Sequence, residues 1–321
     1  AAEGHVLFNV PSWQAYGRLS RHSRDELVAG ARIDVAPYKK DAADFVLWKP
    51  SSEDLPGWDS PWGRGRPGWH IECSAMVTKY LGNTFDIHGG GQDLIFPHHE
   101  NEIAQCLCDE PTDGFAKYWM HNGYLMSEGE KMSKSLGNFY TINELLQAYP
   151  GEAIRLLLIK THYRQPLDFT RSGLDEAKRE LDRFYGALRG LSVDAGDQAL
   201  DADVRAALSD DLNTPLALSA LHAKLRDLNN AEGDAREEAA SELRRAAKVL
   251  GLLEQDPEEW FRWAPSGQEG LDDAQIESLI QQRAEARAAK DFATSDRLRD
   301  ELAEAGIILE DKPEGTIWRR G

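Results

Sequence analysis

The first half of the chain contains two short apolar runs, and the segment between them has the features of a helix. The first run, residues 84–88, is followed by three consecutive glycines, and the second covers residues 118–126. Between them, Pro97 favours the first turn of a helix. A strand, a helix and a strand in this order predict two parallel strands of an α/β sheet. Functional side chains of such sheets gather where the strands end.

From residue 141 the apolar positions follow a helical period. Ile142, Leu145 and Leu146 begin a pattern that continues to about residue 253. This pattern predicts a helical bundle over residues 141–256.

The C-terminal part follows a break that contains Pro and Gly, at residues 257–270. One amphipathic helix is expected over 276–305, and two short apolar runs after it predict a hairpin. We therefore expect residues 271–321 to form a small α+β module.

The N-terminal part is irregular in pattern. Residues 1–68 are rich in Gly, Pro and Trp, and short strand-like pieces at 6–10 and 44–48 lie between turns. We interpret them as an insertion that precedes the parallel-sheet region, residues 69–140.

The composition indicates the cellular compartment in which we expect the protein. The 321 residues contain 41% hydrophobic residues but no apolar run near the roughly 20 residues of a membrane span. The N-terminus shows neither a basic start nor an apolar signal segment, so we expect a cytoplasmic protein without membrane partners. Three cysteines argue against a disulfide framework and leave thiols for metal binding or chemistry.

The net charge of -18 by itself argues against a nucleic-acid partner. Most of the acidic excess lies in the second half of the chain. Any RNA contact would therefore depend on local cationic clusters such as Arg244-Arg245 or Arg319-Arg320.

Lys131, Ser133 and Lys134 place two cations and a hydroxyl in a short segment between Gly129 and Gly137. Lysine ammonium groups and a serine hydroxyl can bind phosphate oxygens, and the glycines allow the loop to close. The pattern favours polyphosphate binding, although an isolated pair of lysines at this spacing is more typical of a solvated turn.

Cys73, His98 and Glu102 form a candidate metal site. On a helix, His98 and Glu102 project from one face, because they are four residues apart. Sulfur, nitrogen and oxygen ligands together suit zinc better than magnesium or calcium. His99 is also three residues from Glu102, so the spacing leaves open which histidine binds. A buried cysteine and a surface His–Glu pair are the alternative interpretation.

The segments that carry these residues resemble the cysteinyl-tRNA synthetase family of class I. The resemblance lies in residues 65–76, 86–91, 96–102 and 131–138, and continues at 210–215 and 290–311. It implies that residues 69–140 are the second half of a Rossmann-like catalytic domain. It also implies that the bundle is of a tRNA-binding type and that the C-terminal module binds the anticodon.

The resemblance further implies site residues. Cys73, His98 and Glu102 would hold a zinc ion that takes the thiolate of substrate cysteine, which serine cannot replace. Trp69 would form a wall of the cysteine pocket.

For the nucleotide, the resemblance implies that His88, Gly90 and Asp93 line the adenylate. Lys131, Ser133 and Lys134 would act on the leaving pyrophosphate, and Mg²⁺ would accompany ATP. The implied partners are ATP, L-cysteine and tRNA(Cys), with a monomeric chain.

One departure from the family is large. The chain starts inside what resembles the insertion, and the family's upstream His-Ile-Gly-His signature and first zinc-binding cysteine are not found. We therefore expect a fragment that is inactive alone.

Two other functions remain open. One is a ligase that joins cysteine to an amino sugar, which would have no use for the segment from Lys290 to Arg320. The other is a non-catalytic tRNA-binding protein, against which the lysine loop and the three candidate zinc ligands argue.

Overall fold

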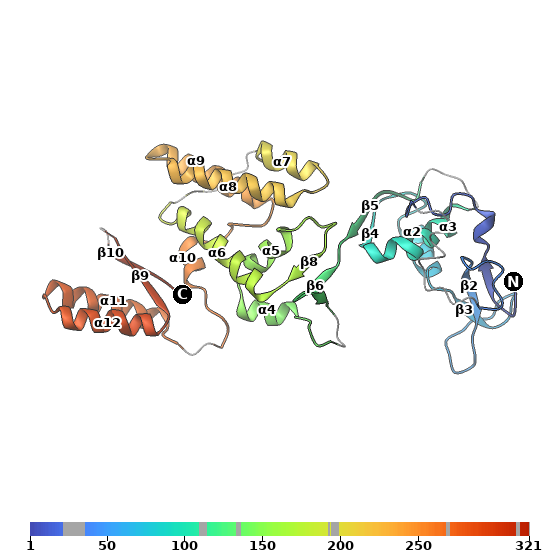
Figure 1. Cartoon of the computed structure of the whole chain (residues 1–321), viewed down its shortest axis with the longest axis horizontal. Coiled ribbons are helices and arrows are strands. Elements are labelled where there is room, and N and C mark those ends of the chain that lie inside the picture. The colour runs from blue at the N-terminus through green and yellow to red at the C-terminus, as the bar shows by residue number, and fades with distance from the viewer. Residues whose placement is uncertain are drawn as a thin grey trace. The chain divides into compact units, whose positions relative to one another are not determined.

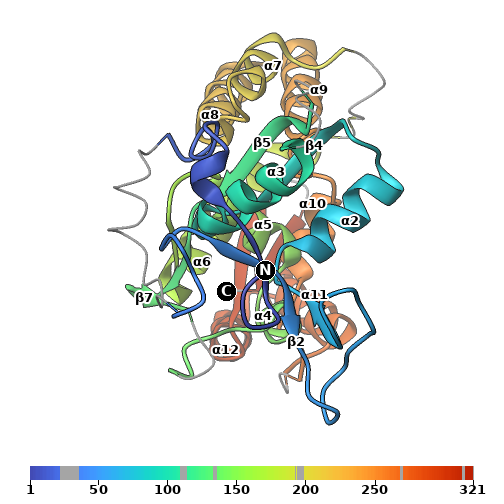
Figure 2. The same ribbon diagram turned by 90° about the vertical axis from the view of Figure 1, so that its right-hand side faces the viewer.

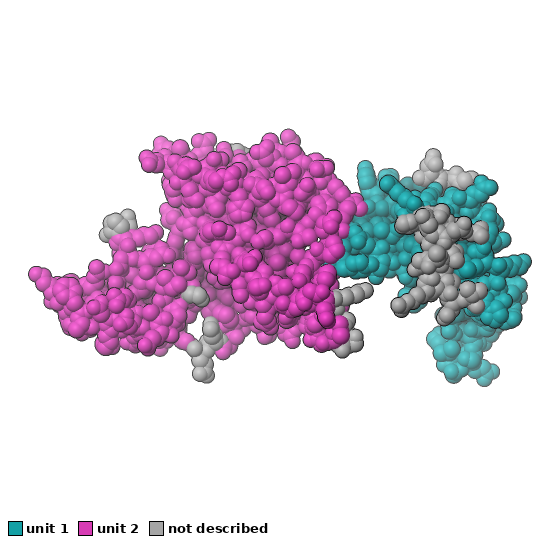
Figure 3. All heavy atoms as spheres, in the orientation of Figure 1, with its two compact units in different colours: residues 1–124 teal, residues 125–321 magenta. Residues whose placement is uncertain are grey.

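The chain divides into two compact units, Ala1–Tyr124 and Leu125–Gly321, which Figure 3 shows in different colours. This computed structural model describes residues 1–21, 36–108, 114–132, 136–191, 193, 199–267, 270–312 and 315–320.

The first unit begins with a three-stranded antiparallel sheet in the order β1-β2-β3. Its strands are β1 (Val6–Phe8), β2 (Phe45–Pro50) and β3 (Gly65–Pro67), with a short turn η1 (Val10–Ser12) after the first. The rings of Phe8 and Phe45 stack at 4.9 Å in its small core. The strand-like pieces expected near residues 6–10 and 44–48 are thereby confirmed.

A parallel pair of strands forms the rest of the first unit (Figure 1). The elements are α2 (Ile71–Tyr80), β4 (Phe85–Gly91), the helical turns η2 (Gln92–Leu94) and η3 (Ile95–His99), α3 (Glu100–Leu107) and β5 (Ala116–Asn122). Ile103 and Leu107 of α3 pack with Phe85 and Phe115 beside the strands, and Figure 2 shows α3 against the pair. The predicted parallel strand–helix–strand unit is confirmed.

The second unit begins with the sheet β7-β6-β8. It contains β6 (Leu125–Ser127), β7 (Glu130–Lys131) and β8 (Leu167–Phe169), and β6 runs parallel to β8. The apolar run at 118–126 thus contains parts of two strands in two different sheets. Its pattern could not show this, because both strands are apolar and only two residues separate them.

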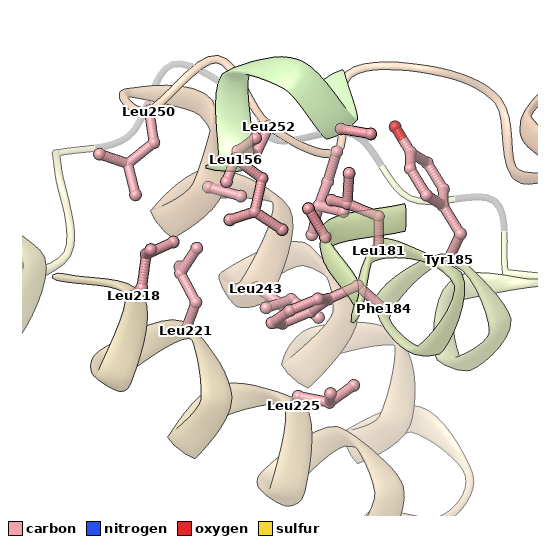
Figure 4. Close-up of a cluster of buried hydrophobic side chains, with 14 of the residues drawn as sticks. Leu156, Leu181, Phe184, Tyr185, Leu218, Leu221, Leu225, Leu243, Leu250 and Leu252 are labelled. Carbon is pink, nitrogen blue, oxygen red and sulfur yellow. The ribbon is translucent and has the colours of Figure 1, made fainter. Parts of the chain in front are cut away.

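In the described part of this unit, seven helices contribute buried residues to one large apolar cluster, two of them before β8 and five after it (Figure 4). They are α4 (Ile142–Ala148), α5 (Gly151–Ile159), α6 (Arg171–Leu188), α7 (Ala202–Ser209), α8 (Thr214–Asn230), α9 (Asp234–Lys248) and α10 (Pro257–Arg262). Leu181 on α6, Leu221 on α8 and Leu243 on α9 are each at most 1% exposed. Removing such side chains from water is the main stabilising contribution in this region.

The C-terminal part contains α11 (Asp273–Ala288), α12 (Phe292–Glu304) and the antiparallel hairpin β9 (Ile307–Lys312) with β10 (Gly315–Arg320). The hairpin confirms the sequence prediction, but the single helix expected over 276–305 is wrong. Lys290 has a left-handed φ of 61°, and Asp291 caps α12 by accepting a hydrogen bond from Thr294 N at 3.1 Å. These two residues end one helix and start the next.

The architecture is of the α/β class expected, with a parallel sheet region followed by helices and a small α+β end. Among the residues that the structure describes, no helix is both long and apolar enough to cross a membrane.

Candidate functional site

The carboxyl end of β4 carries His88 and the three glycines that follow it. In the parallel ladder His88 pairs with Trp119 and Gly90 with His121 of β5. A Cβ atom at Gly90 would lie 2.8 Å from Leu94 Cδ1 and 3.2 Å from His99 Cε1. Glycine at position 90 lets the Leu94 and His99 side chains pack against the backbone of β4, and any larger residue would require both to shift.

Five histidines gather near this edge of the sheet. Nδ1 of His99 lies 2.9 Å from Nε2 of His121, and Nε2 of His70 lies 2.8 Å from Nδ1 of His98. The rings of His88 and His99 meet edge to face with centroids 4.4 Å apart. The cluster brings together the residue that caps the start of α2, one residue each from β4 and β5, and two residues from η3, directly before α3.

The environment keeps two of these rings neutral. Burial, reinforced by the neighbouring His88 and His121, lowers the pKa of His99 to about 3. Burial and the proximity of His98 lower the pKa of His70 to about 4. Neutral imidazoles present a lone pair, which is the form that binds metal ions.

Glu102 is the buried carboxylate of the cluster and is 5% exposed. Its Oε2 atom lies 3.1 Å from His88 Nε2, but no group in the described part of the chain gives this oxygen a hydrogen bond of good geometry. A buried carboxylate oxygen without a hydrogen bond is costly, so the site favours a cation at this position.

The ligand atoms of His88, His99 and Glu102 all lie within 4.8 Å of one another. This group differs from the predicted set, because it contains His99, which the spacing left open, and His88, which the resemblance implied for the nucleotide. Cys73, His98 and Glu102 are not gathered to that distance among the described residues. Cys73 and His98 as zinc ligands stay a prediction.

Cys73 lies on the first turn of α2, where its side chain is exposed. Partial burial and the carboxylates of Glu102 and Glu72 raise the pKa of its thiol. Trp69, four residues earlier, is 80% exposed.

Asp93 lies in η2 directly after the glycines. A Cβ atom at Gly91 would collide with the carboxylate of Asp93, so this side chain lies over the backbone at the end of β4. The expected nucleotide residues His88, Gly90 and Asp93 therefore belong to one short stretch of the chain in the first unit.

Part of the lysine loop lies outside the described residues, namely Ser133 and Lys134. Lys131 ends β7, and its backbone pairs with Met126. Gly129 and Gly137 have φ angles of 84° and 67°, which glycine adopts without strain.

Sequence reasoning missed His70 and His121 as members of the cluster. Neither lies in a spacing pattern with Glu102. For His121 the signal available was the pairing of two parallel strands, since histidines near the ends of both strands must lie on the same edge of the sheet. His70, which caps the start of α2, gave no such signal.

Comparison with known protein families gives three matches along the chain. Residues 1–179 match the tRNA synthetases class I (C) catalytic domain, residues 203–254 match the DALR domain, and residues 271–319 match the cysteinyl-tRNA ligase anticodon binding domain.

Two curated relatives agree with these matches. A cysteine–tRNA ligase of Rhodospirillum centenum is 61% identical over 321 residues, covering 100% of this chain and 70% of the relative. That of Paramagnetospirillum magneticum is 60% identical with the same coverage of each chain. A LeuRS chain in a ternary complex from Agrobacterium radiobacter has a TM-score of 0.45 at 18% identity, over 82% of this chain and 39% of that one.

The matched catalytic domain defines a class I aminoacyl-tRNA synthetase. The chain belongs to the cysteine–tRNA ligase family of these enzymes.

Proposed function

We propose that this chain serves the ATP-dependent activation of L-cysteine to cysteinyl-adenylate and the transfer of cysteine to the 3′ end of tRNA(Cys). The observation that carries the proposal is the presence, in one chain, of a catalytic, a DALR and an anticodon-binding match in that order. The histidine-rich edge of the β4–β5 sheet supports it, because ligands of parallel sheets bind beyond the carboxyl ends of their strands.

A zinc ion suits the group of histidines and Glu102 near the ends of β4 and β5. Glu102 offers a buried oxygen without a hydrogen bond, and the neighbouring histidines are neutral. We propose Glu102, Cys73 and His98 as the residues that hold the ion, although the ligand atoms within 4.8 Å of one another are those of Glu102, His88 and His99. Zinc would bind the substrate thiolate and so separate cysteine from serine, because sulfur is the softer ligand.

The remaining residues of the proposed site would bind and orient the adenylate, the substrate cysteine and the pyrophosphate. His88, Gly90 and Asp93 would line the adenylate, and the exposed indole of Trp69 would cover the cysteine side chain. Lys131 and Lys134, with the hydroxyl of Ser133, would stabilise negative charge on the leaving pyrophosphate, which Mg²⁺ accompanies. Such stabilisation needs no covalent intermediate with the protein.

The C-terminal module favours tRNA over a small acceptor such as an amino sugar. The helix pair α11–α12 and the β9–β10 hairpin have their own core, formed by Ile276, Leu302 and Trp318. Residues 271–319 match an anticodon binding domain, for which a small-molecule acceptor would have no use.

The test of function is cysteine-dependent exchange between ATP and pyrophosphate, followed by charging of tRNA(Cys), with the complete product of the reading frame. Exchange should require cysteine and fail with serine. Lys134→Ala should slow it by about 100-fold or more, whereas Lys248→Ala on the exposed side of α9 should leave it unchanged. Equal exchange with serine and cysteine would refute the proposed selectivity.

The two ligand sets can be separated with cobalt in place of zinc. If Cys73 is a ligand, the cobalt protein should show a thiolate-to-metal absorption band that Cys73→Ser removes. If His88 and His99 hold the metal with Glu102 instead, this band should be absent, and metal content should fall in His99→Ala and not in Cys73→Ser.

A further inference from the structure

The first turn of α3 buries two polar side chains to which the proposed function gives no role. Glu100 is 0% exposed and Asn101 is 2% exposed. They lie between His99 and Glu102 in the sequence, and neither is a predicted ligand of the metal or of the nucleotide. A polar group inside a protein needs hydrogen-bond partners, so the partners of these two side chains show what they do.

Asn101 is held by a tyrosine of the N-terminal insertion. Tyr16 Oη donates a hydrogen bond to Asn101 Oδ1 at 2.6 Å, although the two residues are 85 positions apart in the sequence. The ring of Tyr16 meets that of Phe96 in η3 edge to face, with centroids 6.3 Å apart. Burial, reinforced by the carboxylate of Glu100, raises the pKa of the Tyr16 phenol, so Tyr16 keeps the proton that it donates.

Glu100 is held by the same segment of the insertion. The backbone N–H groups of Leu19 and Ser20 donate hydrogen bonds to Glu100 Oε2 at 3.2 Å and 3.1 Å. Both side chains buried at the start of α3 therefore tie the insertion to the helical turn that carries Glu102.

A series of polar contacts continues from Asn101 to His98. Asn101 Nδ2 lies 3.4 Å from His70 Nδ1, and His70 Nε2 lies 2.8 Å from His98 Nδ1. The His70 ring also meets the ring of Phe45 in β2 edge to face, with centroids 6.0 Å apart. Tyr16, Asn101, His70 and His98 thus form one relay, in which each side chain fixes the next.

The relay can hold His98 in either neutral form of its ring. An amide nitrogen only donates, so in the structure His70 Nδ1 accepts and the proton on its Nε2 points to His98 Nδ1. A metal bound at His98 Nε2 requires the proton on Nδ1, and the hydrogen bonds of the relay would then run in the opposite direction. Imidazole and phenol groups can both donate and accept, and half a turn of the Asn101 amide exchanges its oxygen and nitrogen.

We propose that Tyr16 and Asn101 are positioning residues of the metal site, which act through His70 to fix the ring of His98. The proposal rests on the proposed function, which supplies His98 as a zinc ligand. Groups that hydrogen-bond to a metal-binding histidine fix its ring and its tautomer, and their loss typically lowers metal affinity by about 10- to 100-fold. The insertion thereby contributes to zinc affinity through Tyr16, which is not itself a ligand.

The test measures the Kd for zinc by competition with a chelator, using the complete product of the reading frame. Tyr16→Phe removes one hydroxyl and keeps the ring, and it should raise the Kd about tenfold. Tyr80→Phe is the matched control, because it removes the hydroxyl of a ring on α2 that is 72% exposed, and it should leave the Kd unchanged.

Two substitutions of Asn101 give a readout that a merely structural role would not give. Asn101→Asp keeps an acceptor for both neighbours and favours His98 with its proton on Nδ1, so zinc should bind at least as tightly as in the unsubstituted protein. Asn101→Leu is similar in size but removes both contacts, and it should raise the Kd about tenfold or more. Equal weakening of zinc binding in the two variants would overturn the proposal.

His98→Ala separates this proposal from the proposed ligand set. If His98→Ala loses zinc while Tyr16→Phe and Asn101→Leu bind it with the unsubstituted Kd, the relay is wrong and His98 stands as a ligand. If His98→Ala binds zinc with the unsubstituted Kd, both the ligand assignment and the relay are overturned.

Discussion

The two units of this molecule bury different kinds of side chain. In the first unit, the start of α3 buries the polar residues His99, Glu100, Asn101 and Glu102. In the second, the helices α5 to α10 bury a continuous set of leucine, alanine and aromatic side chains (Figure 4). Burying polar groups costs free energy and burying apolar groups supplies it. The first unit thus buries polar groups at the candidate site, whereas the second buries the apolar groups that supply stability.

A buried carboxylate in each unit sharpens this difference. Glu152 of the second unit accepts hydrogen bonds from Tyr185 Oη at 2.8 Å, from Leu253 N at 3.1 Å and from Glu254 N at 3.3 Å. In the part of the chain that the structure describes, the buried carboxylate oxygens without a hydrogen bond belong to Glu100 and Glu102 of the first unit. Glu152 is satisfied by the protein itself, whereas Glu102 leaves a position for a ligand.

The largest expected effect comes from the apolar core. Leu221→Ala on α8 should destabilise the second unit by about 4 kcal/mol, because the side chain is 1% exposed and its removal leaves a cavity. Leu216→Ala, on the same helix but 51% exposed, should change stability little. Urea unfolding followed by hydrogen exchange, segment by segment, measures both. Equal losses in the two variants would contradict the assignment of α8's buried face.

The second prediction concerns Glu180, a buried carboxylate in the second unit. Burial raises the pKa of Glu180, but hydrogen bonds from His222 and Lys160 outweigh it and lower the pKa to about 2. Because the folded-state value lies below the unfolded one, this group's contribution is present above about pH 4.5 and is lost as the pH falls towards 2. The contribution is about 3 kcal/mol at most.

Glu180→Gln should therefore flatten the loss of stability between pH 4.5 and pH 2 in the second unit. Glu176→Gln, one turn earlier on the exposed face of α6, is the matched control and should retain the wild-type slope. Unfolding midpoints in urea at a series of pH values give the result. A wild-type slope in Glu180→Gln would show that its partners do not hold the carboxylate in solution.

The third prediction concerns the stabilisation of the first unit by zinc. Zinc at one hundred times its Kd should stabilise the first unit by about 2.7 kcal/mol, since it binds the folded state. Glu102→Gln should abolish this gain and leave the second unit unchanged. Hydrogen exchange of residues 85–107, with and without zinc, measures this stabilisation. Equal stabilisation of both units by zinc would place the metal elsewhere.

The sequence predicted elements whose signals are local. The parallel strands β4 and β5, the hairpin β9–β10 and the helices after Thr141 all follow from apolar runs, periodicity and glycine positions. Thr141 itself completes a capping box with Glu144, which a local pattern can also show.

The site was harder to predict because it depends on pairing between distant residues. Glu102 was identified from its spacing to His98, but its contact with His88 follows from the packing of α3 on β4. His121 joins the cluster only through the register of β5 against β4. No spacing within one element encodes these contacts, so the sequence alone left the ligand set open.

The break between α11 and α12 gives the smallest predicted effect and tests why the sequence prediction of one helix failed. The apolar spacing runs through the break, but Lys290 adopts a φ of 61° that a side chain disfavours. Lys290→Gly should stabilise the C-terminal module by about 1 kcal/mol, because glycine adopts this angle without strain. Ala288→Gly, at the end of α11, should destabilise it by a similar amount. If Lys290→Gly destabilised the module as well, residues 288–292 would be helical in solution, and the continuous helix predicted from the apolar spacing would be right.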